Sequence, residues 1–118
     1  MPYLLLIIEP RGQRAARQPD EAKGTFDEMM AFAADLQQRG VLLRADSLRT
    51  DDHAVRLTRQ PGRPNLLDGP FAEAKEMVGG FFLIDVATRE DAVAIAQRCP
   101  AMNWATVEVR ECAPCHVL

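Results

Sequence analysis

Two short segments of this 118-residue chain are apolar on both faces of an extended backbone, and they constrain the fold more than any other feature. A strand that is buried on both sides reads as a continuous apolar run rather than an alternating one. Residues 2–9 and 79–86 have this character; in the first, Leu5 and Ile7 share one face while Leu6 lies on the other. We therefore expect both segments to be central strands of a sheet.

The rest of the chain alternates turn-forming stretches with amphipathic ones. Gly and Pro residues mark the turns, and apolar positions three or four residues apart mark the helices. The pattern predicts, in order, a loop at residues 10–24, a helix at 25–38, a strand at 41–48, a turn at 51–53, an exposed hairpin at 54–60 and 64–67, a helix from 88 to 100, and a last strand at 104–109.

Both predicted helices carry the sequence of a capping box, in which two side chains satisfy free backbone N–H groups at the helix start. The pairs are Thr25 with Glu28 and Thr88 with Asp91. The apolar stripe of the first helix contains two methionines, which suit either the core or a ligand groove, and core packing is the commoner use. The members of this stripe are Phe26, Met29, Met30, Ala33 and Leu36.

The order of elements is β-α-β, an inserted hairpin, then β-α-β, which predicts an α+β fold of the ferredoxin-like type. Right-handed crossovers place both helices on one face of such a sheet. The other face is then apolar and uncovered, which monomeric proteins avoid. A second copy of the sheet is the simplest cover, so we expect a homodimer.

Length and charge narrow the class of protein. A chain of 118 residues suits one domain, which we assign to residues 1–118, with a flexible tail at 111–118. The formal net charge of -3 argues against nucleic acid as a partner, and the arginines at 11–17 and 56–63 are interpreted as solvated surface. No apolar run approaches the about 20 residues that cross a bilayer, and no signal-peptide pattern is present. We expect a cytoplasmic protein without membrane contact.

The C-terminal segment spells Cys-x-x-Cys-His at Cys112, Cys115 and His116, a pattern that also attaches haem. Haem attachment needs a second axial ligand and an enclosing pocket, and a segment so close to the chain end is unsuited to supply them. Three zinc ligands are the minor alternative. We expect a frayed tail, no cofactor and no metal site.

The most distinctive motif lies between the hairpin and the second central strand. Asp68-Gly69-Pro70-Phe71 is followed by Glu73, Lys75 and Glu76 and then by Gly79-Gly80 and an aromatic residue. This segment resembles the signature of the YCII-related family, in the branch named for its Asp-Gly-Pro-Phe tetrapeptide. The strand ending in Glu9, the helix closing at Gly40 and the last strand also fit.

The resemblance implies a dimeric α/β barrel, built from two ferredoxin-like sheets packed face to face. It further implies either a small-molecule function in a cleft of the dimer or a link to extracytoplasmic-function sigma factors, beside which some relatives are encoded. Relatives that resemble enzymes use a His–Asp pair. This chain has no His in its first predicted helix, since His53 falls in the turn and His116 in the tail.

The motif supports two readings. In the structural one, which we favour, Asp68 accepts hydrogen bonds from backbone N–H groups, Gly69 and Pro70 turn the chain, and Phe71 fills the core, while Glu73, Lys75 and Glu76 form a solvated charge run. In the catalytic one, Asp68 is a general base, and the ligand contacts come from Lys75, Glu73, Glu76 and Phe71.

A second candidate site follows from the topology. We expect the ferredoxin-like plan to make the two central strands parallel neighbours. Glu9 and Asp85 would then both lie near the carboxyl ends of these strands, the edge where α/β folds often bind ligands. Two neighbouring carboxylates would shift each other's pKa, which is useful for proton transfer. The simpler reading is that each carboxylate solvates a strand end.

Together these features predict a small-molecule-binding protein, and the catalytic reading makes it a cofactor-independent enzyme that uses Asp68, Glu9 and Asp85. The alternative is a non-catalytic regulatory module that acts through a protein contact in sigma-factor-controlled transcription.

Overall fold

The computed structural model describes the backbone of residues 1–118 and every side chain except those of residues 63 and 64. The strands are β1 (Tyr3–Pro10), β2 (Leu42–Ser47), β3 (Val55–Gln60), β4 (Arg63–Asp68), β5 (Glu76–Ile84) and β6 (Thr106–Glu111). The helices are α1 (Gln13–Ala16), α2 (Pro19–Gln38) and α3 (Arg89–Gln97), and two 3-10 turns are η1 (Asp51–His53) and η2 (Pro100–Asn103). The mixed α+β class predicted from the sequence is confirmed.

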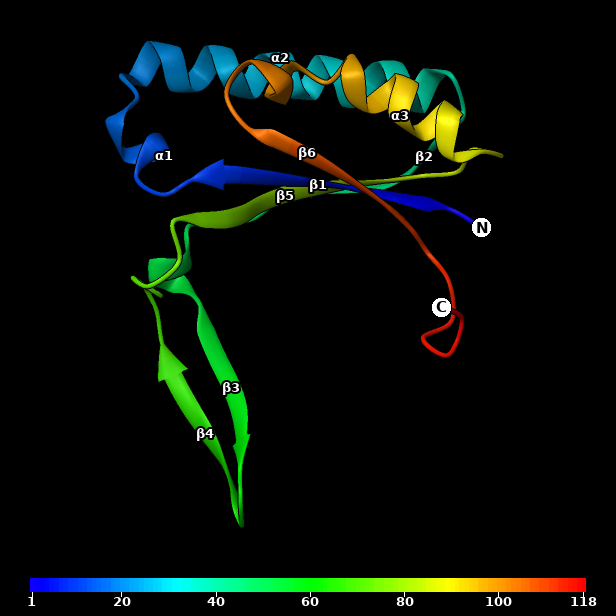
Figure 1. The fold of residues 1–118 in the computed structure, drawn as a ribbon. Helices are drawn as coiled ribbons and strands as arrows, with labels where there is room; N and C mark the ends of the chain where they lie inside the picture. The colour runs from blue at the N-terminus through cyan, green and yellow to red at the C-terminus, as the bar shows by residue number, and fades with distance from the viewer.

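Four strands form one antiparallel sheet in the order β2-β5-β1-β6, and β3 and β4 form a separate hairpin. The helices lie over one face of the sheet, and the hairpin projects away from it on the opposite side (Figure 1). This order agrees with the ferredoxin-like plan. The sheet is open, and no barrel closes within the chain.

The prediction that the two central strands run parallel is wrong. β1 and β5 are antiparallel, with Tyr3 opposite Ile84 and Glu9 opposite Met77. The reason is the way the two β-α-β units interleave: each unit joins parallel strands, but a strand of the other unit lies between them. Adjacent strands therefore run in opposite directions.

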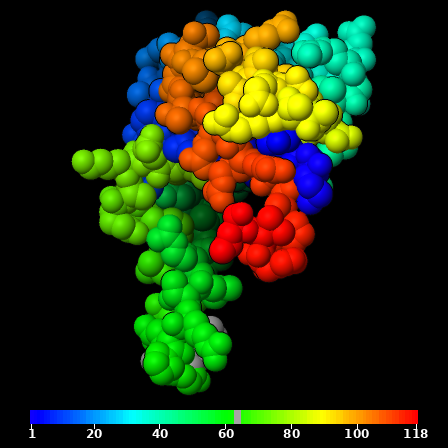
Figure 2. All heavy atoms as spheres, turned by 45° about the vertical axis from the view of Figure 1, so that its right-hand side comes forward, coloured from blue at the N-terminus to red at the C-terminus, as the bar shows by residue number. Residues whose placement is uncertain are grey.

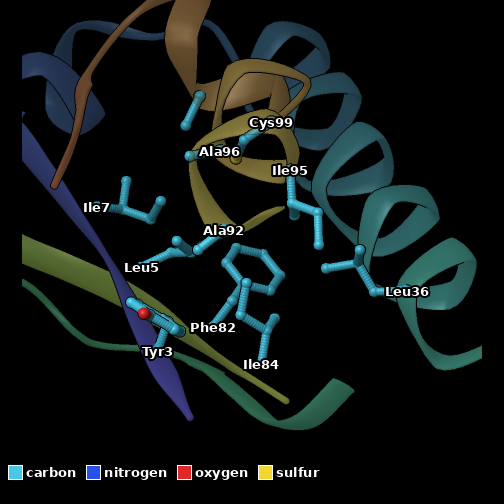
Figure 3. Close-up of a cluster of buried hydrophobic side chains, with 11 residues drawn as sticks. Tyr3, Leu5, Ile7, Leu36, Phe82, Ile84, Ala92, Ile95, Ala96 and Cys99 are labelled. Carbon is cyan, nitrogen blue, oxygen red and sulfur yellow. The ribbon is translucent and has the colours of Figure 1, made fainter. Parts of the chain in front are cut away.

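The core lies between the sheet and the helices (Figure 3). Leu5 and Ile84 are completely buried there, and Leu36 of α2 meets them from above. The rings of Phe32 and Phe82 pack edge to face with centroids 5.2 Å apart. Other members of the cluster are Tyr3, Ile7, Ala92, Ile95, Ala96, Cys99 and Ala101.

Helix α2 begins at Pro19, six residues before the predicted start, so the region predicted as a loop is largely helical. Pro at the first helical position is pre-organised for a helix, and Asp20 and Glu21 favour the positive end of the helix dipole. The predicted capping box of Thr25 and Glu28 is wrong because both residues lie inside the helix. The predicted cap of α3 is present, since Thr88 Oγ1 accepts a hydrogen bond from Asp91 N at 3.0 Å.

The hairpin is present as predicted and protrudes as an arm (Figures 1 and 2). The Arg63 side chain lies outside the described residues. The predicted tail boundary shifts, because Glu111 belongs to β6 opposite Tyr3 and Cys112 N donates to Pro2 O. Among the helices, none has the length and apolar character needed to span a membrane.

Candidate functional site

Glu9 is the only charged side chain that is fully buried among the described residues, with 1% of its surface exposed. It continues the buried set of Tyr3, Leu5 and Ile7 on the helix-facing side of β1. A buried carboxylate needs a partner, and Arg14 supplies it. Arg14 Nε lies 2.7 Å from Glu9 Oε1, and Arg14 Nη2 donates to Glu9 Oε2 at 3.3 Å.

The Glu9 Oε1 contact is an ion pair without hydrogen-bond geometry, so Oε1 accepts no hydrogen bond from a described residue. Arg14 is also fixed by two backbone carbonyls. Its Nη1 donates to Leu48 O at 2.6 Å and its Nη2 to Gly79 O at 2.8 Å. The guanidinium of Arg14 thus joins β1 to Gly79 within β5 and to Leu48, which follows β2. The Oε1 atom of Glu9 retains acceptor capacity.

Gly79 makes room for this pair. The register of β1 against β5 jumps from Gly80 to Val78, so Gly79 is the extra residue of a β-bulge. A Cβ atom on Gly79 would collide with Glu9 Oε2 and would lie 2.8 Å from Arg14 Nη2. Gly80 is constrained as well, but less tightly, because its Cβ would lie 2.9 Å from Asp46 O. The close approach predicted for these glycines is confirmed, and at Gly79 the neighbour is a carboxylate rather than backbone.

A cavity of about 240 Å³ opens beside Glu9, between α2 and the sheet. We call it the α2 cavity. Phe26, Met29 and Met30 form its apolar wall, and Arg14, Arg17 and Trp104 lie at its polar side. Phe26 and Met30 are 52% and 56% exposed, so part of the stripe interpreted as core packing lines a cavity instead.

Arg17 and Trp104 are joined at this cavity by stacking. The Arg17 guanidinium carbon lies 4.5 Å from the centroid of the Trp104 ring. Gln13 links the two, because it accepts from Arg17 Nη2 at 3.2 Å and donates to Trp104 O at 2.8 Å. Trp104 Nε1 is buried and has no hydrogen-bond partner among the described residues.

A larger and more open hollow of about 570 Å³ lies between α2 and the segment from α3 to η2. Its charged lining residues, Glu28, Asp35, Arg39 and Arg98, are all exposed. Of these two, only the smaller α2 cavity is lined by a buried carboxylate, and we place the candidate site there. The buried ionisable group at the larger hollow is Cys99, a thiol whose pKa is raised by burial.

The Asp-Gly-Pro-Phe segment is anchored elsewhere, by Arg11 and Asp51. Arg11 Nη1 donates to Asp51 Oδ1 at 2.6 Å, while its Nη2 and Nε donate to the carbonyl oxygens of Phe71 and Ala74 at 3.0 and 2.7 Å. Asp51 also accepts from Phe71 N at 3.3 Å. The hydrogen bond from Arg11 holds the pKa of the Asp51 carboxyl below its usual value.

Asp68 does not have the contacts predicted for it. It is exposed at the end of β4, and no described residue forms a hydrogen bond or ion pair with its carboxylate. It is Asp51 that accepts a hydrogen bond from a backbone N–H of the motif, that of Phe71. Gly69 is packed against the backbone of Asp51, and a cis peptide joins it to Pro70.

The side chains that we assigned to ligand binding are absent from the lining of the α2 cavity. Phe71 is buried, but under the Arg56 guanidinium at 3.8 Å and outside the main core cluster. Glu73, Lys75 and Glu76 are exposed, and Glu73 Oε1 pairs with Arg56 Nη1 at 3.1 Å. The solvated charge run is confirmed.

Asp85 does not meet Glu9. Asp85 directly follows β5, whose last residue lies opposite the first residue of β1. Glu9 lies near the other end of β1. Asp85 is exposed, and its backbone N–H donates to Val41 O. The predicted carboxylate pair is therefore wrong, because it depended on the parallel arrangement.

The residues that sequence reasoning missed are Arg14, Arg17 and Trp104. Arg14 and Arg17 lay in a segment read as solvated. Glu9 could be found from the sequence because it ends the first apolar strand. No motif indicated that Arg14 would be its cationic partner. Among the described residues, no group of three or more His, Cys, Asp or Glu side chains is arranged to hold a metal ion.

Comparison with known proteins adds three similarities. The family model described as the YCII-related domain matches residues 1–115. The chain is 30% identical over 115 residues to an uncharacterized protein from Rhizobium meliloti (strain 1021), covering 96% of this chain and 93% of that protein. Its fold is similar to that of 5-chloro-2-hydroxyhydroquinone dehydrochlorinase from Burkholderia phenoliruptrix AC1100, solved in complex with 2,5-dihydroxybenzoquinone. That match has a TM-score of 0.55 and 12% identity, and covers 96% of this chain and 94% of the other.

Proposed function

Because this chain belongs to the YCII-related domain family, we propose that it binds a small organic molecule in the α2 cavity. The buried Glu9 carboxylate beside that cavity is the observation that carries the proposal. Burying an ionised group is costly unless function or pairing maintains it. Both oxygens of Glu9 contact Arg14, and Oε1, which accepts no hydrogen bond from a described residue, retains acceptor capacity toward a bound molecule.

We further propose Glu9 as the proton-transfer group if the bound molecule is converted. A general base must lie within hydrogen-bond reach of the proton that it removes, and the carboxylate lines the cavity. The similar fold of a dehydrochlorinase bound to a dihydroxybenzoquinone supports a small cyclic compound as a first probe. The Asp-Gly-Pro-Phe tetrapeptide at residues 68–71 supports membership of the branch named for it.

The proposal includes a homodimer. The sheet face opposite the helices carries Leu6 and Leu83 in half-buried positions, and the hairpin arm extends on that same side (Figure 1). Val55, Leu57 and Leu66 share one face of the arm and are exposed. An isolated two-stranded hairpin is only marginally stable in water, so a second copy that packs on both surfaces is the simplest cover for them.

The binding test uses Trp104, the only tryptophan of the chain, as a fluorescent reporter. A panel of small cyclic compounds that includes 2,5-dihydroxybenzoquinone is titrated, with isothermal calorimetry as a second readout. We expect saturable binding of one molecule per chain. Ala22→Phe, which narrows the cavity, should weaken it at least about tenfold, equivalent to about 1.4 kcal/mol. Ala34→Phe places the same ring on an exposed part of α2 outside the cavity lining and should leave it unchanged.

The proposal fails if no compound in the panel binds, or if both variants bind as wild type does. The regulatory module linked to sigma-factor-controlled transcription would then be the better hypothesis. If a compound is turned over, Glu9→Gln should abolish turnover while changing the Kd little.

A further inference from the structure

The charged side chains that line the α2 cavity, two arginines and two carboxylates, are not all held in ion pairs. Four charged side chains line it, and two of them, Glu9 and Arg14, neutralise each other. The third, Asp46, pairs with Arg44 Nε at 2.9 Å. Arg17, the fourth, has no carboxylate partner among the described residues. Arg17 is therefore the one cationic group of the cavity lining that no described carboxylate occupies.

Arg14 is not available to balance an incoming anion. Its Nε, Nη1 and Nη2 already contact Glu9, Leu48 O and Gly79 O. Turning the guanidinium toward a ligand would leave the Glu9 carboxylate buried without its partner, which is strongly destabilising. Any anion in this cavity must be recognised by another group.

Arg17 has the required freedom. It is half-buried, its guanidinium stacks on Trp104, and Gln13 accepts its one side-chain hydrogen bond. The contact with the ring and the single hydrogen bond to Gln13 leave other N–H groups of the guanidinium without a partner among the described residues, and a guanidinium can bind a carboxylate in a bidentate manner. Trp104, whose ring lies under this guanidinium, also lines the cavity, and its buried Nε1 has no hydrogen-bond partner in the described part of the chain.

The apolar residues of the cavity lining indicate the character of the uncharged part of the ligand. Phe26, Met29 and Met30 offer an apolar, adaptable wall, and about 240 Å³ leaves space for a small molecule only. We infer that the ligand is a small monoanion with an apolar ring, and that Arg17 is the residue that binds its negatively charged oxygen. This inference rests on the proposed function and specifies its ligand class.

The test compares matched probes on the wild-type chain, read by Trp104 fluorescence and calorimetry. Benzoate is paired with neutral benzamide, and 4-nitrophenolate with 4-nitroanisole, so the two pairs distinguish a carboxylate from an ionised phenol. At least one anion should bind about tenfold more tightly than its neutral partner, as expected for a charge-assisted hydrogen bond. The preference should shrink as salt is added.

Variants then locate the preference. Arg17→Met removes the charge but keeps an apolar chain over Trp104, so the anion and its neutral partner should bind alike. Arg17→Lys keeps the charge without the planar fork and should restore part of the preference. Arg89→Met, an exposed arginine at the start of α3 and outside the cavity lining, should behave as wild type.

Two outcomes overturn the inference: neutral probes that bind as tightly as the anions, or a preference that persists in Arg17→Met. Failure of the inference is distinguishable from failure of the proposed function. In the first case neutral compounds still bind in a way that Ala22→Phe blocks, and in the second no compound of either charge binds in the cavity.

Discussion

Gly79 lies against the Glu9 carboxylate so closely that a single added methyl group would overlap Glu9 Oε2. The bulge in β5 and the buried ion pair of β1 are thus one feature. Position 79 requires glycine because the side chain of Glu9, which is distant in the sequence, occupies the space that a Cβ atom would need.

Gly79→Ala should therefore destabilise the chain. The Cβ would lie 2.6 Å from Glu9 Cδ as well as 2.8 Å from Arg14 Nη2, so the ion pair must move. Overpacking of this kind costs about 1–3 kcal/mol, measurable by urea unfolding. Gly24→Ala is the matched control: Gly24 lies inside α2 with open space around it, and alanine there should stabilise by about 0.5–1 kcal/mol. Equal effects of the two substitutions would contradict the packing argument.

The Arg11–Asp51 pair should make stability depend on pH in acid. The pKa of Asp51 is lowered in the folded chain by the hydrogen bond from Arg11. Its stabilisation is therefore fully present above the unfolded value of 3.8 and is lost as the pH falls through the lower folded-state pKa.

Asp51→Asn should remove this part of the acid sensitivity, as seen in melting temperatures measured from neutral pH down to acid. Arg11→Gln should do the same, and the double variant should add little further because the two side chains act as a unit. Additive losses in the double variant would show that the residues are not coupled.

Asp68→Asn should leave the free energy of unfolding within about 0.5 kcal/mol of wild type, as for other exposed positions. The reason is that no described residue binds the Asp68 carboxylate, whereas Asp51 accepts from both Arg11 and Phe71 N. Urea unfolding of Asp68→Asn beside Asp51→Asn measures the contrast. A large loss in the former would return the structural role to Asp68.

The chain should have about twice its 13.1 kDa mass in light scattering at micromolar concentration, as expected for the common two-fold homodimer. Leu57→Glu places a charge on the apolar face of the hairpin arm and should shift the mass toward that of one chain. Thr58→Glu adds the same charge to the opposite face of the same strand and should leave the dimer intact. A monomeric wild type would overturn the dimer proposal.

The sequence by itself determined the class of fold, because its information was local or periodic. Each of the features that predicted it depends on neighbours a few residues away: the apolar runs of β1 and β5, the turn residues of the hairpin and the Thr88 cap. The motif at residues 68–80 could also be recognised, and the prediction that other groups approach Gly79 and Gly80 closely was correct.

Only the tertiary structure decided the position of the candidate site at the α2 cavity. Strand direction sets which ends of β1 and β5 meet, so it separated Asp85 from Glu9 and brought Gly79 to Glu9 instead. Arg14 and Arg17 looked like solvated charges because they lay in an expected loop. Glu9 is only five residues from Arg14, but Gly79 and Trp104 come from distant parts of the chain. A pairing between distant side chains leaves no periodic trace in the sequence, and it is these pairings that form the α2 cavity.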